Sequence, residues 1–386
     1  MAPPHADPSP GTCTHGGASF DAVGSEFDRL ERRRDVINAD VLDAWFDPAP
    51  AVVEALREHL PWLLRTSPPT HAEGLVRVIA RERGVPPQSV LTAGGSSELI
   101  YLALPRWVSP GARVLLVDPS YGEYEHLLGR VLGAQVQHLA LRREEGWRLD
   151  PARLGRALAE QQPDLLVLVN PSSPTGLHVE AGALRALFAS LPARTRVWVD
   201  ETYVDFAGPG ASLEPLAAQH PRVAVSKSMS KAYALSGVRA AYMVAAPEVL
   251  APLRPFLPPW SVGLLAQVAA VRALEDRSWY AARWADTHRL RGELACGLTG
   301  LGWRVTPSVT NFLLAELPEG APEAPAACAA LAARGLWIRD LSTLGTALGR
   351  RAVRLAVKDA ATQARMLALL GEVLGAGRAP AGSGPA

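Results

Sequence analysis

The sequence predicts an α/β protein: a mostly parallel sheet of about seven strands with helices on both faces, plus a smaller α/β domain. Between residues 89 and 246, short apolar runs alternate with segments of helical pattern. Such runs are typical of strands buried on both faces, and alternation with helices is typical of parallel sheets. With 386 residues, 48% of them apolar, the chain is large enough for two domains. We expect strands at 90–92, 114–117, 136–139, 165–169, 197–199, 223–225 and 241–244.

Helical periodicity precedes this region. Apolar residues recur at helix spacing between Val52 and Leu60, which predicts a helix over 51–60. A Ser- and Pro-containing break at 65–69 ends that pattern, and a second helix is expected at 71–83.

A second group of elements follows the predicted sheet. A long helical region at about 263–298 leads out of the first domain, and short strands then alternate with helices to form the smaller domain. We expect strands at 303–305, 311–314, 336–338 and 353–357, and helices at 324–334 and 362–374.

Composition excludes several classes of protein. The formal net charge is +1, which gives no indication of nucleic acid or an acidic membrane as partner. No apolar stretch approaches the ~20 residues of a membrane helix, and residues 1–19 lack the pattern of a signal peptide. Cys13, Cys296 and Cys328 are far apart, and no CxxC or HExxH motif is present. We therefore expect no metal site, no membrane or nucleic-acid partner and a cytoplasmic location.

Lysine is rare in this chain. Of 39 lysine and arginine residues, only Lys227, Lys231 and Lys358 are lysines. A surface charge can be either residue, but only an amine can lose its proton when desolvated and act as a nucleophile. Composition alone leaves two interpretations of Lys231 open, a chemically active amine and a solvated loop lysine.

Candidate motifs begin where predicted strands end, the place at which sheets of this kind bind ligands. Gly95, Ser96 and Ser97 follow a strand and open a helix, whose free amides favour an anion; a simple helix cap is the alternative. Asp200 ends an apolar strand, where an acid needs a partner because burial of its charge is costly.

The stretch 228–239 resembles a known signature. Ser228-x-Ser230-Lys231, followed by Gly237-x-Arg239, resembles the cofactor-lysine motif of class I/II aminotransferases, which are fold-type-I pyridoxal-phosphate (PLP) enzymes. The resemblance extends from about residue 37 to 374 and is greatest to histidinol-phosphate aminotransferases and threonine-phosphate decarboxylases. It implies that Lys231 carries PLP as a Schiff base.

The same resemblance implies how the cofactor is held. The phosphate is expected on Gly95, Ser96, Ser97, Ser228, Ser230 and Arg239. Tyr121, in a Pro-x-Tyr motif, would stack on the pyridine ring, although a tyrosine packed on the core is the alternative. Asp200 would keep the pyridine nitrogen protonated, so that the ring can accept electrons. Tyr203 would donate to the phenolic oxygen of the cofactor.

One motif departs from the family pattern. Asn170-Pro-Ser-Ser173-Pro-Thr-Gly resembles the family's Asn-Pro-x-Asn-Pro-Thr-Gly turn, but Ser173 replaces the second asparagine. The family's asparagine contacts the phenolic oxygen, and a serine is shorter. Either Asn170 compensates or that contact is lost.

Two arginines are candidates for binding the substrate. The resemblance implies that Arg354, within an apolar strand, holds a substrate carboxylate as a bidentate fork. A strand arginine facing solvent is the alternative. Arg339 matches a second arginine that assists phosphate or carboxylate binding in relatives.

These observations predict a homodimeric PLP-dependent aminotransferase acting on a small-molecule amino substrate, an amino acid or a phosphorylated amino alcohol, with a keto-acid acceptor. A decarboxylase or cyclising enzyme on the same fold is the first alternative. A PLP-binding regulatory module is the second, but 36 residues before Ile37 are too few for an appended DNA-binding domain. We expect a disordered or irregular tail at 1–36, a small domain from 37–60 and 291–374, a large PLP-binding domain at 61–290 and a flexible tail at 375–386.

Overall fold

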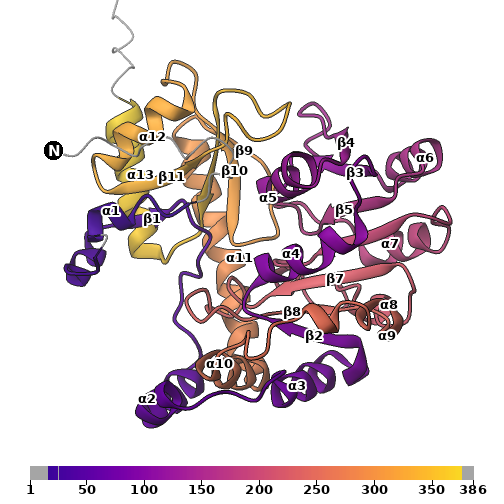
Figure 1. Cartoon of the computed structure of the whole chain (residues 1–386). Helices are drawn as coiled ribbons and strands as arrows, with labels where there is room; N and C mark the ends of the chain where they lie inside the picture. Colours follow the sequence, from indigo (N-terminus) through magenta and orange to yellow (C-terminus); the bar gives the residue numbers. More distant parts are fainter. Residues whose placement is uncertain (1–15, 25, 376–386) are drawn as a thin grey trace, which may run out of the picture.

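The computed structural model describes residues 16–24 and 26–375, which form two sheets with their helices (Figure 1). The predicted tail segments 1–15 and 376–386 lie outside the described residues. Within the part expected to be a disordered or irregular tail, the structure has two short helices, α1 (Phe20–Val23) and η1 (Leu30–Arg34). None of the described helices is both long and apolar enough to span a membrane.

The larger sheet has seven strands in the order β2-β8-β7-β6-β5-β3-β4, which confirms the prediction. Only β8 runs antiparallel to its neighbours, β2 and β7. The other pairs are parallel, as the long connections through helices require. The strands are β2 (Val90–Ala93), β3 (Arg113–Asp118), β4 (Gln135–Ala140), β5 (Leu165–Val169), β6 (Arg196–Asp200), β7 (Val223–Ser228) and β8 (Ala241–Val244).

Alternate side chains of these strands enter two separate cores, one on each face of the sheet. In β5, Leu166 and Leu168 join one core, whereas Leu165 and Val167 join the other. Both faces are therefore covered by helices, which explains why β5 is apolar at every position. The helices of this region are α3 (Glu73–Arg83), α4 (Ser96–Trp107), α5 (Gly122–Glu125), α6 (Pro151–Gln161), α7 (Ala181–Phe188), α8 (Glu214–Ala217) and α9 (Pro247–Leu250).

The smaller sheet has five strands in the order β1-β11-β12-β10-β9. Its first strand comes from the N-terminal part of the chain and pairs in parallel with β11, although about 300 residues of sequence separate them. The other pairs are antiparallel. The elements are β1 (Ile37–Ala39), β9 (Arg304–Val305), β10 (Phe312–Glu316), β11 (Leu336–Asp340) and β12 (Ala352–Ala356), with α12 (Ala324–Ala332) and α13 (Ala360–Gly375).

Two helical segments differ from the sequence prediction. Helix α2 (Pro50–Arg65) packs against α10 (Leu264–Glu275), apart from β1 and the smaller sheet with which residues 37–60 were grouped (Figure 1). The long helical region is two helices, because Asp276 ends α10 and its carboxylate caps α11 (Arg277–Gly300).

Candidate active site

Lys231 lies three residues beyond the end of β7, where parallel strands of the large sheet present their carboxyl ends. Its Nζ donates to Asp43 Oδ1 at 3.0 Å, and its side chain is 18% exposed. Burial lowers the pKa of Lys231, and the nearby charge of Asp43 opposes that shift only in part. The amine is therefore easier to deprotonate than an ordinary lysine while it stays accessible to small molecules.

Side-chain hydrogen bonds hold the turn that carries Lys231. Ser236 Oγ lies 3.1 Å from the carbonyl of Ser230, and Trp284 Nε1 donates to the carbonyl of Ala232 at 2.8 Å. Ser236 also donates to Asp43 at 2.6 Å. These contacts fix both the turn and the carboxylate beside the amine.

The start of α4 and Arg239 lie together, as expected of a phosphate site. Gly95 has φ of +117°, and a Cβ added there would collide with the guanidinium of Arg239. The amides of Ser96 and Ser97 belong to the first turn of α4, where backbone N–H groups have no partner within the helix. Arg239 also lowers the pKa of Lys231, so that it lies within electrostatic reach of the amine.

The two other expected phosphate ligands are buried at the end of β7. Ser228 Oγ accepts from the backbone N–H of Ser230 at 3.2 Å, and both residues are about 4% exposed. Their hydroxyls lie on the chain between the strand and Lys231.

Asp200 is buried at the end of β6. Burial raises the pKa of this carboxyl, although hydrogen bonds from Thr202 and Tyr124 oppose the shift. Thr202 donates through Oγ1 at 2.6 Å and through its backbone N–H at 2.9 Å, and Tyr124 Oη donates at 2.8 Å. The carboxylate is thus fixed in position but has no cationic partner among these contacts, which suits it to a protonated ring nitrogen.

Tyr203 and Ser173 meet beside these groups. Tyr203 is buried and hydrogen-bonded to Ser173, and burial raises its pKa well above the ordinary value while Arg354 opposes the shift. Its hydroxyl also lies within electrostatic reach of Asp200 and Asp43. Tyr121 meets Tyr124 edge-on, with ring centroids 5.9 Å apart. It also lies within electrostatic reach of Arg354 and acts to raise the pKa of that arginine.

The side-chain amide of Asn170 is bonded to the backbone of its own turn. Its side-chain amide donates to the carbonyl of Val179 at 2.9 Å and accepts from the N–H of Val179 at 2.8 Å. These two bonds use the amide to close the 170–179 loop.

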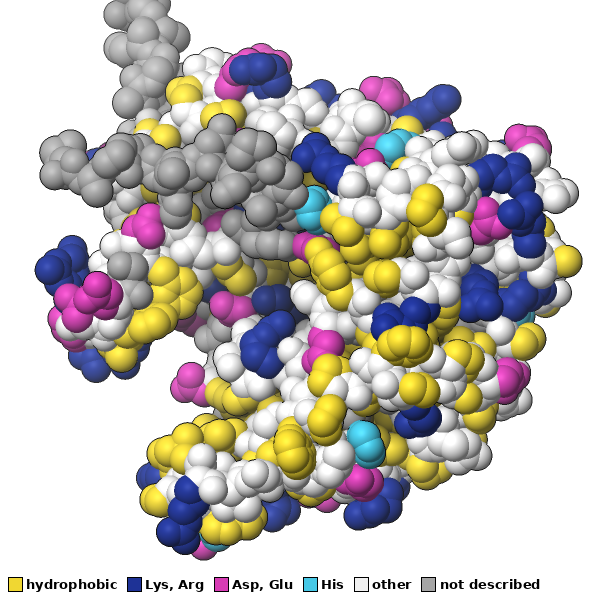
Figure 2. Space-filling view, in the orientation of Figure 1, with side chains coloured by type: hydrophobic (Ala, Val, Ile, Leu, Met, Phe, Trp, Pro, Cys, Tyr) yellow, Lys and Arg dark blue, Asp and Glu magenta, His cyan; other side chains and the backbone are white. Residues whose placement is uncertain are grey.

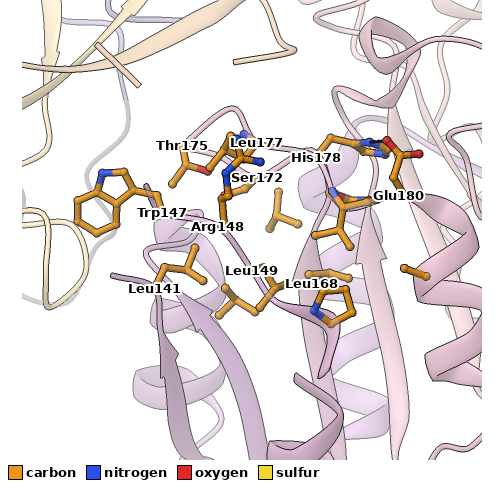
Figure 3. A pocket seen from close by; sticks show the side chains of 16 residues that line it. Leu141, Trp147, Arg148, Leu149, Leu168, Ser172, Thr175, Leu177, His178 and Glu180 are labelled. Carbon is orange, nitrogen blue, oxygen red and sulfur yellow. Dashed lines mark hydrogen bonds and ion pairs between the residues drawn. The ribbon is translucent and has the colours of Figure 1, made fainter. Parts of the chain in front are cut away.

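A cavity of about 260 Å³ lies behind this loop, and Figure 3 shows that its wall is mostly apolar, with Leu141, Trp147 and Leu168 among the lining residues.

Arg354 faces the site from β12. Its Nη1 donates to Ser173 Oγ at 3.1 Å, and its guanidinium lies 5.5 Å from the centre of the Phe312 ring. Its Nε is buried with no hydrogen-bond partner among the described residues. Burial lowers the pKa of Arg354 to about 10. A buried, under-partnered guanidinium is ready for an anionic group from outside the chain.

Arg339 lies beside Arg354, but its guanidinium is paired with an acid. The two residues are opposite one another in the β11–β12 pair, and Arg339 Nε forms an ion pair with Asp40 Oδ1 at 2.7 Å. Asp40 therefore compensates much of the charge of Arg339. This leaves Arg354 as the better candidate for a substrate carboxylate.

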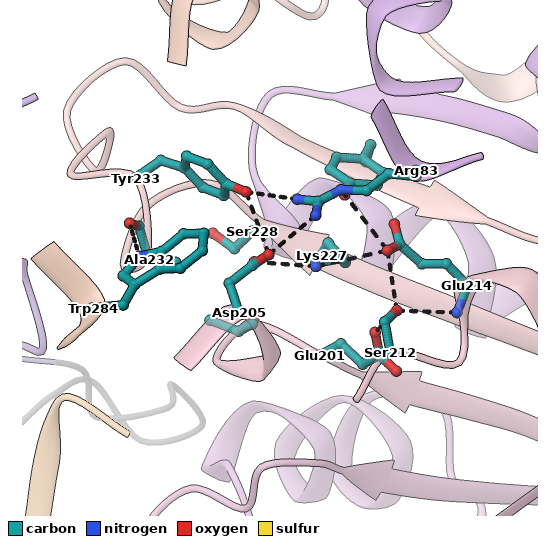
Figure 4. Close-up of polar contacts among 12 residues, drawn as sticks. Arg83, Glu201, Asp205, Ser212, Glu214, Lys227, Ser228, Ala232, Tyr233 and Trp284 are labelled. Carbon is teal, nitrogen blue, oxygen red and sulfur yellow. Dashed lines mark hydrogen bonds and ion pairs between the residues drawn. The ribbon is translucent and has the colours of Figure 1, made fainter. Parts of the chain in front are cut away.

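Lys227, only four residues before Lys231, belongs to a buried charge cluster formed by Arg83, Glu201, Asp205, Glu214 and Lys227 (Figure 4). Lys227 Nζ lies 3.1 Å from Asp205 and 3.8 Å from Glu214, and Arg83 Nη1 lies 3.2 Å from Asp205. Glu201 and Asp205 of this cluster are both buried.

Sequence reasoning missed several members of the site. Asp43 and Asp40 lie in the irregular segment after β1, which carries no motif, and Tyr124 lies one helical turn beyond Tyr121. Thr202 could have been found, because it lies between Asp200 and Tyr203 and threonine often bonds to nearby acids.

These residues fit PLP. An arginine lies beside a glycine at a helix start for the phosphate, a buried carboxylate is available for the ring nitrogen, and an amine with a lowered pKa is available for the aldehyde. Bound there, PLP supplies an electron-accepting ring that stabilises negative charge on a substrate carbon.

Comparison with known proteins gives the same result. Residues 35–372 match the family model "Aminotransferase class I and II". A histidinol-phosphate aminotransferase from Anaeromyxobacter sp. (strain Fw109-5) is 31% identical over 92% of this chain and 96% of its own, and one from Oleidesulfovibrio alaskensis is 33% identical over 76% and 77%.

Solved structures share the fold. Histidinol-phosphate aminotransferase from Sinorhizobium meliloti, solved with pyridoxal-5'-phosphate, has a TM-score of 0.78 at 23% identity and covers 95% of this chain and 99% of its own. L-threonine-O-3-phosphate decarboxylase from Porphyromonas gingivalis has a TM-score of 0.74 at 24% identity, covering 87% and 99%. With the family model and the relatives, the site described above shows that the chain belongs to the class I and II aminotransferases and is a PLP-dependent enzyme of that family.

Proposed function

We propose that this aminotransferase acts on an α-amino acid whose carboxylate binds Arg354. The observation that carries the proposal is the state of that arginine: it is buried next to Ser173, it has an unpartnered Nε, and its pKa is lowered to about 10. A carboxylate would satisfy the buried guanidinium by two parallel hydrogen bonds.

The residues of the chain have distinct roles in this proposal. Lys231 Nζ removes the proton from the substrate α-carbon, because its lowered pKa makes it easier to deprotonate than an ordinary lysine. Arg354 orients the substrate by its carboxylate, so that the proton on the α-carbon points toward the amine. With the cofactor bound, Asp200 would favour a positive charge on the ring nitrogen, and Tyr203 would donate to the phenolic oxygen.

We further propose a homodimer, a cytoplasmic location, a PLP-binding domain at 61–290 and the C-terminal part of a small domain at 291–374. The homodimer is supported by α2, on which Val53, Leu60, Trp62 and Leu64 are exposed. Figure 2 shows hydrophobic side chains gathered at that helix. Apolar patches of this kind are typical of surfaces that bind another subunit.

A single-turnover experiment tests the reaction. The PLP-loaded enzyme is mixed with individual amino acids without a keto-acid acceptor, and the products are identified by mass spectrometry. We expect one pyridoxamine phosphate and one keto acid for each active site. Stoichiometric carbon dioxide with the cofactor unchanged would contradict the proposal and favour a decarboxylase.

A further inference from the structure

Asp43 places a carboxylate directly beside the amine of Lys231. It comes from the irregular segment between β1 and α2, accepts from Lys231 Nζ at 3.0 Å and from Ser236 Oγ at 2.6 Å, and is 44% exposed. Burial alone would raise the pKa of Asp43, but the charge of Lys231 and the two hydrogen bonds lower it overall. Asp43 is therefore an accessible, ionised carboxylate at the reactive amine.

The hydrogen bond from Lys231 to Asp43 depends on the state of the amine. If Lys231 carries the cofactor, its nitrogen would keep at most one of the three N–H donors of an ammonium ion. Ser236 donates a hydrogen bond but supplies no charge. Lys358 is within electrostatic reach of Asp43, but burial lowers its pKa to about 8, so that it loses its charge as the pH rises through about 8.

Asp43 and Arg354 both lie near Tyr203. The charges of both residues shift the pKa of the Tyr203 hydroxyl, which is hydrogen-bonded to Ser173, and Ser173 accepts from Arg354 Nη1 at 3.1 Å. Among the described residues, the site thus presents a guanidinium that forms no ion pair and an exposed carboxylate whose hydrogen bond from Lys231 depends on the state of that amine. A ligand with complementary charges at two positions would satisfy both groups.

We infer that Asp43 recognises a cationic side-chain group of the substrate, so that this enzyme acts on a basic α-amino acid carrying an ammonium or guanidinium group. The inference rests on the proposed function, because it takes Arg354 as the site of the α-carboxylate. It makes Asp43 a specificity-determining residue, with Ser236 holding it in place.

The charges also argue against a phosphorylated amino alcohol. A phosphate needs cations that are free to bind it, and Arg339 forms an ion pair with Asp40 at 2.7 Å. The carboxylate of Asp43 would repel a phosphate brought near it.

Binding of two unreactive ligands tests the inference. δ-Guanidinovalerate and δ-ureidovalerate have nearly the same shape and both carry a carboxylate, but only the first is cationic and neither has an α-amino group. Isothermal titration calorimetry on the PLP-loaded enzyme should show at least about tenfold tighter binding of the guanidinium compound, because a hydrogen bond to a charged group contributes about 1.5–3 kcal/mol.

Variants then assign the preference to one carboxylate. Asp43→Asn should bring the affinity ratio close to one, whereas Asp43→Glu should keep part of it. Asp47→Asn removes the same charge from an exposed position in the same segment and should leave the ratio unchanged.

Two results would overturn the inference: equal affinities of the two ligands for the unmodified enzyme, or a ratio that survives Asp43→Asn. The first needs no variant, so that a folding defect could not obscure it. If the guanidinium compound is preferred but no basic amino acid yields pyridoxamine phosphate, the recognition of a cation by Asp43 stands, and transamination of a basic amino acid is contradicted.

Discussion

Two lysines four residues apart, Lys227 and Lys231, have opposite electrostatic surroundings. Lys227 is 1% exposed and lies within 4 Å of both Asp205 and Glu214, in the buried cluster shown in Figure 4. Lys231 is desolvated as well, but it has a single carboxylate partner in Asp43 and lies near the cations Arg239 and Arg354. A buried charge that neighbouring opposite charges balance is held as part of the fold. A buried charge that they balance only in part is readier to react.

The arginines of the two regions repeat this difference. Arg83, in the cluster, is surrounded by Asp205, Glu214 and two tyrosine hydroxyls, and these partners outweigh burial and raise its pKa. Arg354 forms no ion pair among the described residues, and burial outweighs the effects of Tyr203, Asp40 and Tyr121 and lowers its pKa to about 10. The charges of the cluster thus have their partners within the chain, while Lys231 and Arg354 have fewer such partners, as the proposed binding of cofactor and substrate requires.

The largest effect on activity is expected at Lys231, for which Lys227 serves as a control. Lys231→Ala should lower kcat by about 10²–10⁴-fold or more, because it removes the attachment point and the general base together. Borohydride should fix the cofactor covalently to Lys231 in the unmodified enzyme, as found by peptide mass spectrometry. Lys227 is the internal control, and an adduct on Lys227 or Lys358 would reverse the assignment of roles.

Asp200→Asn should reduce kcat more than tenfold while PLP stays bound. A neutral amide cannot keep the ring nitrogen protonated, and a tenfold loss corresponds to about 1.4 kcal/mol. Cofactor content and kcat are measured on the same preparation. A variant that keeps more than about a tenth of the activity would show that the charge of Asp200 matters little.

The arginines should separate binding from stability. Arg354→Ala should weaken carboxylate-containing ligands at least about tenfold with little change in the free energy of unfolding. Arg83→Ala should instead cost about 3–5 kcal/mol of stability, because it leaves buried acids unpaired. Denaturant unfolding and ligand titration of both variants are compared. Equal destabilisation by the two substitutions would remove the distinction between the regions.

The smallest effect concerns Glu201, whose pKa burial raises to about 8. In the unfolded chain the carboxyl of Glu201 ionises with the usual pKa of a glutamate. In the folded protein it keeps its proton until the pH approaches about 8. The contribution of Glu201 to the free energy of unfolding is therefore complete below the pKa that this carboxyl has in the unfolded chain, and it is lost as the pH rises through about 8. Glu201→Gln should flatten the decline in melting temperature between about pH 5 and about pH 8. A slope unchanged by the substitution would show that Glu201 is ionised in the cluster.

The sequence was sufficient for the parts of the molecule that depend on local pattern. All seven strands of the large sheet follow from apolar runs, and the motif around Lys231 predicts the family. Asp43 could not be found in this way, because 188 residues separate it from Lys231 and irregular backbone brings it there. The position of α2 likewise depends on packing against α10, which periodicity does not encode.

Asn170 illustrates a different limit. The motif predicts the turn, but it does not predict the hydrogen-bond partners of the Asn170 side chain. In the structure these partners are the backbone N–H and carbonyl of Val179.

The scarcity of lysine also makes this enzyme unusually suitable for chemical labelling. Side-chain amines are present at only three positions, and Lys227 is inaccessible within its cluster. Acylating reagents that modify many sites on most proteins would meet only Lys231, Lys358 and the chain terminus here. Loading with cofactor should therefore lower the mass gained by the native protein on acylation by one label, because Lys231 is then blocked.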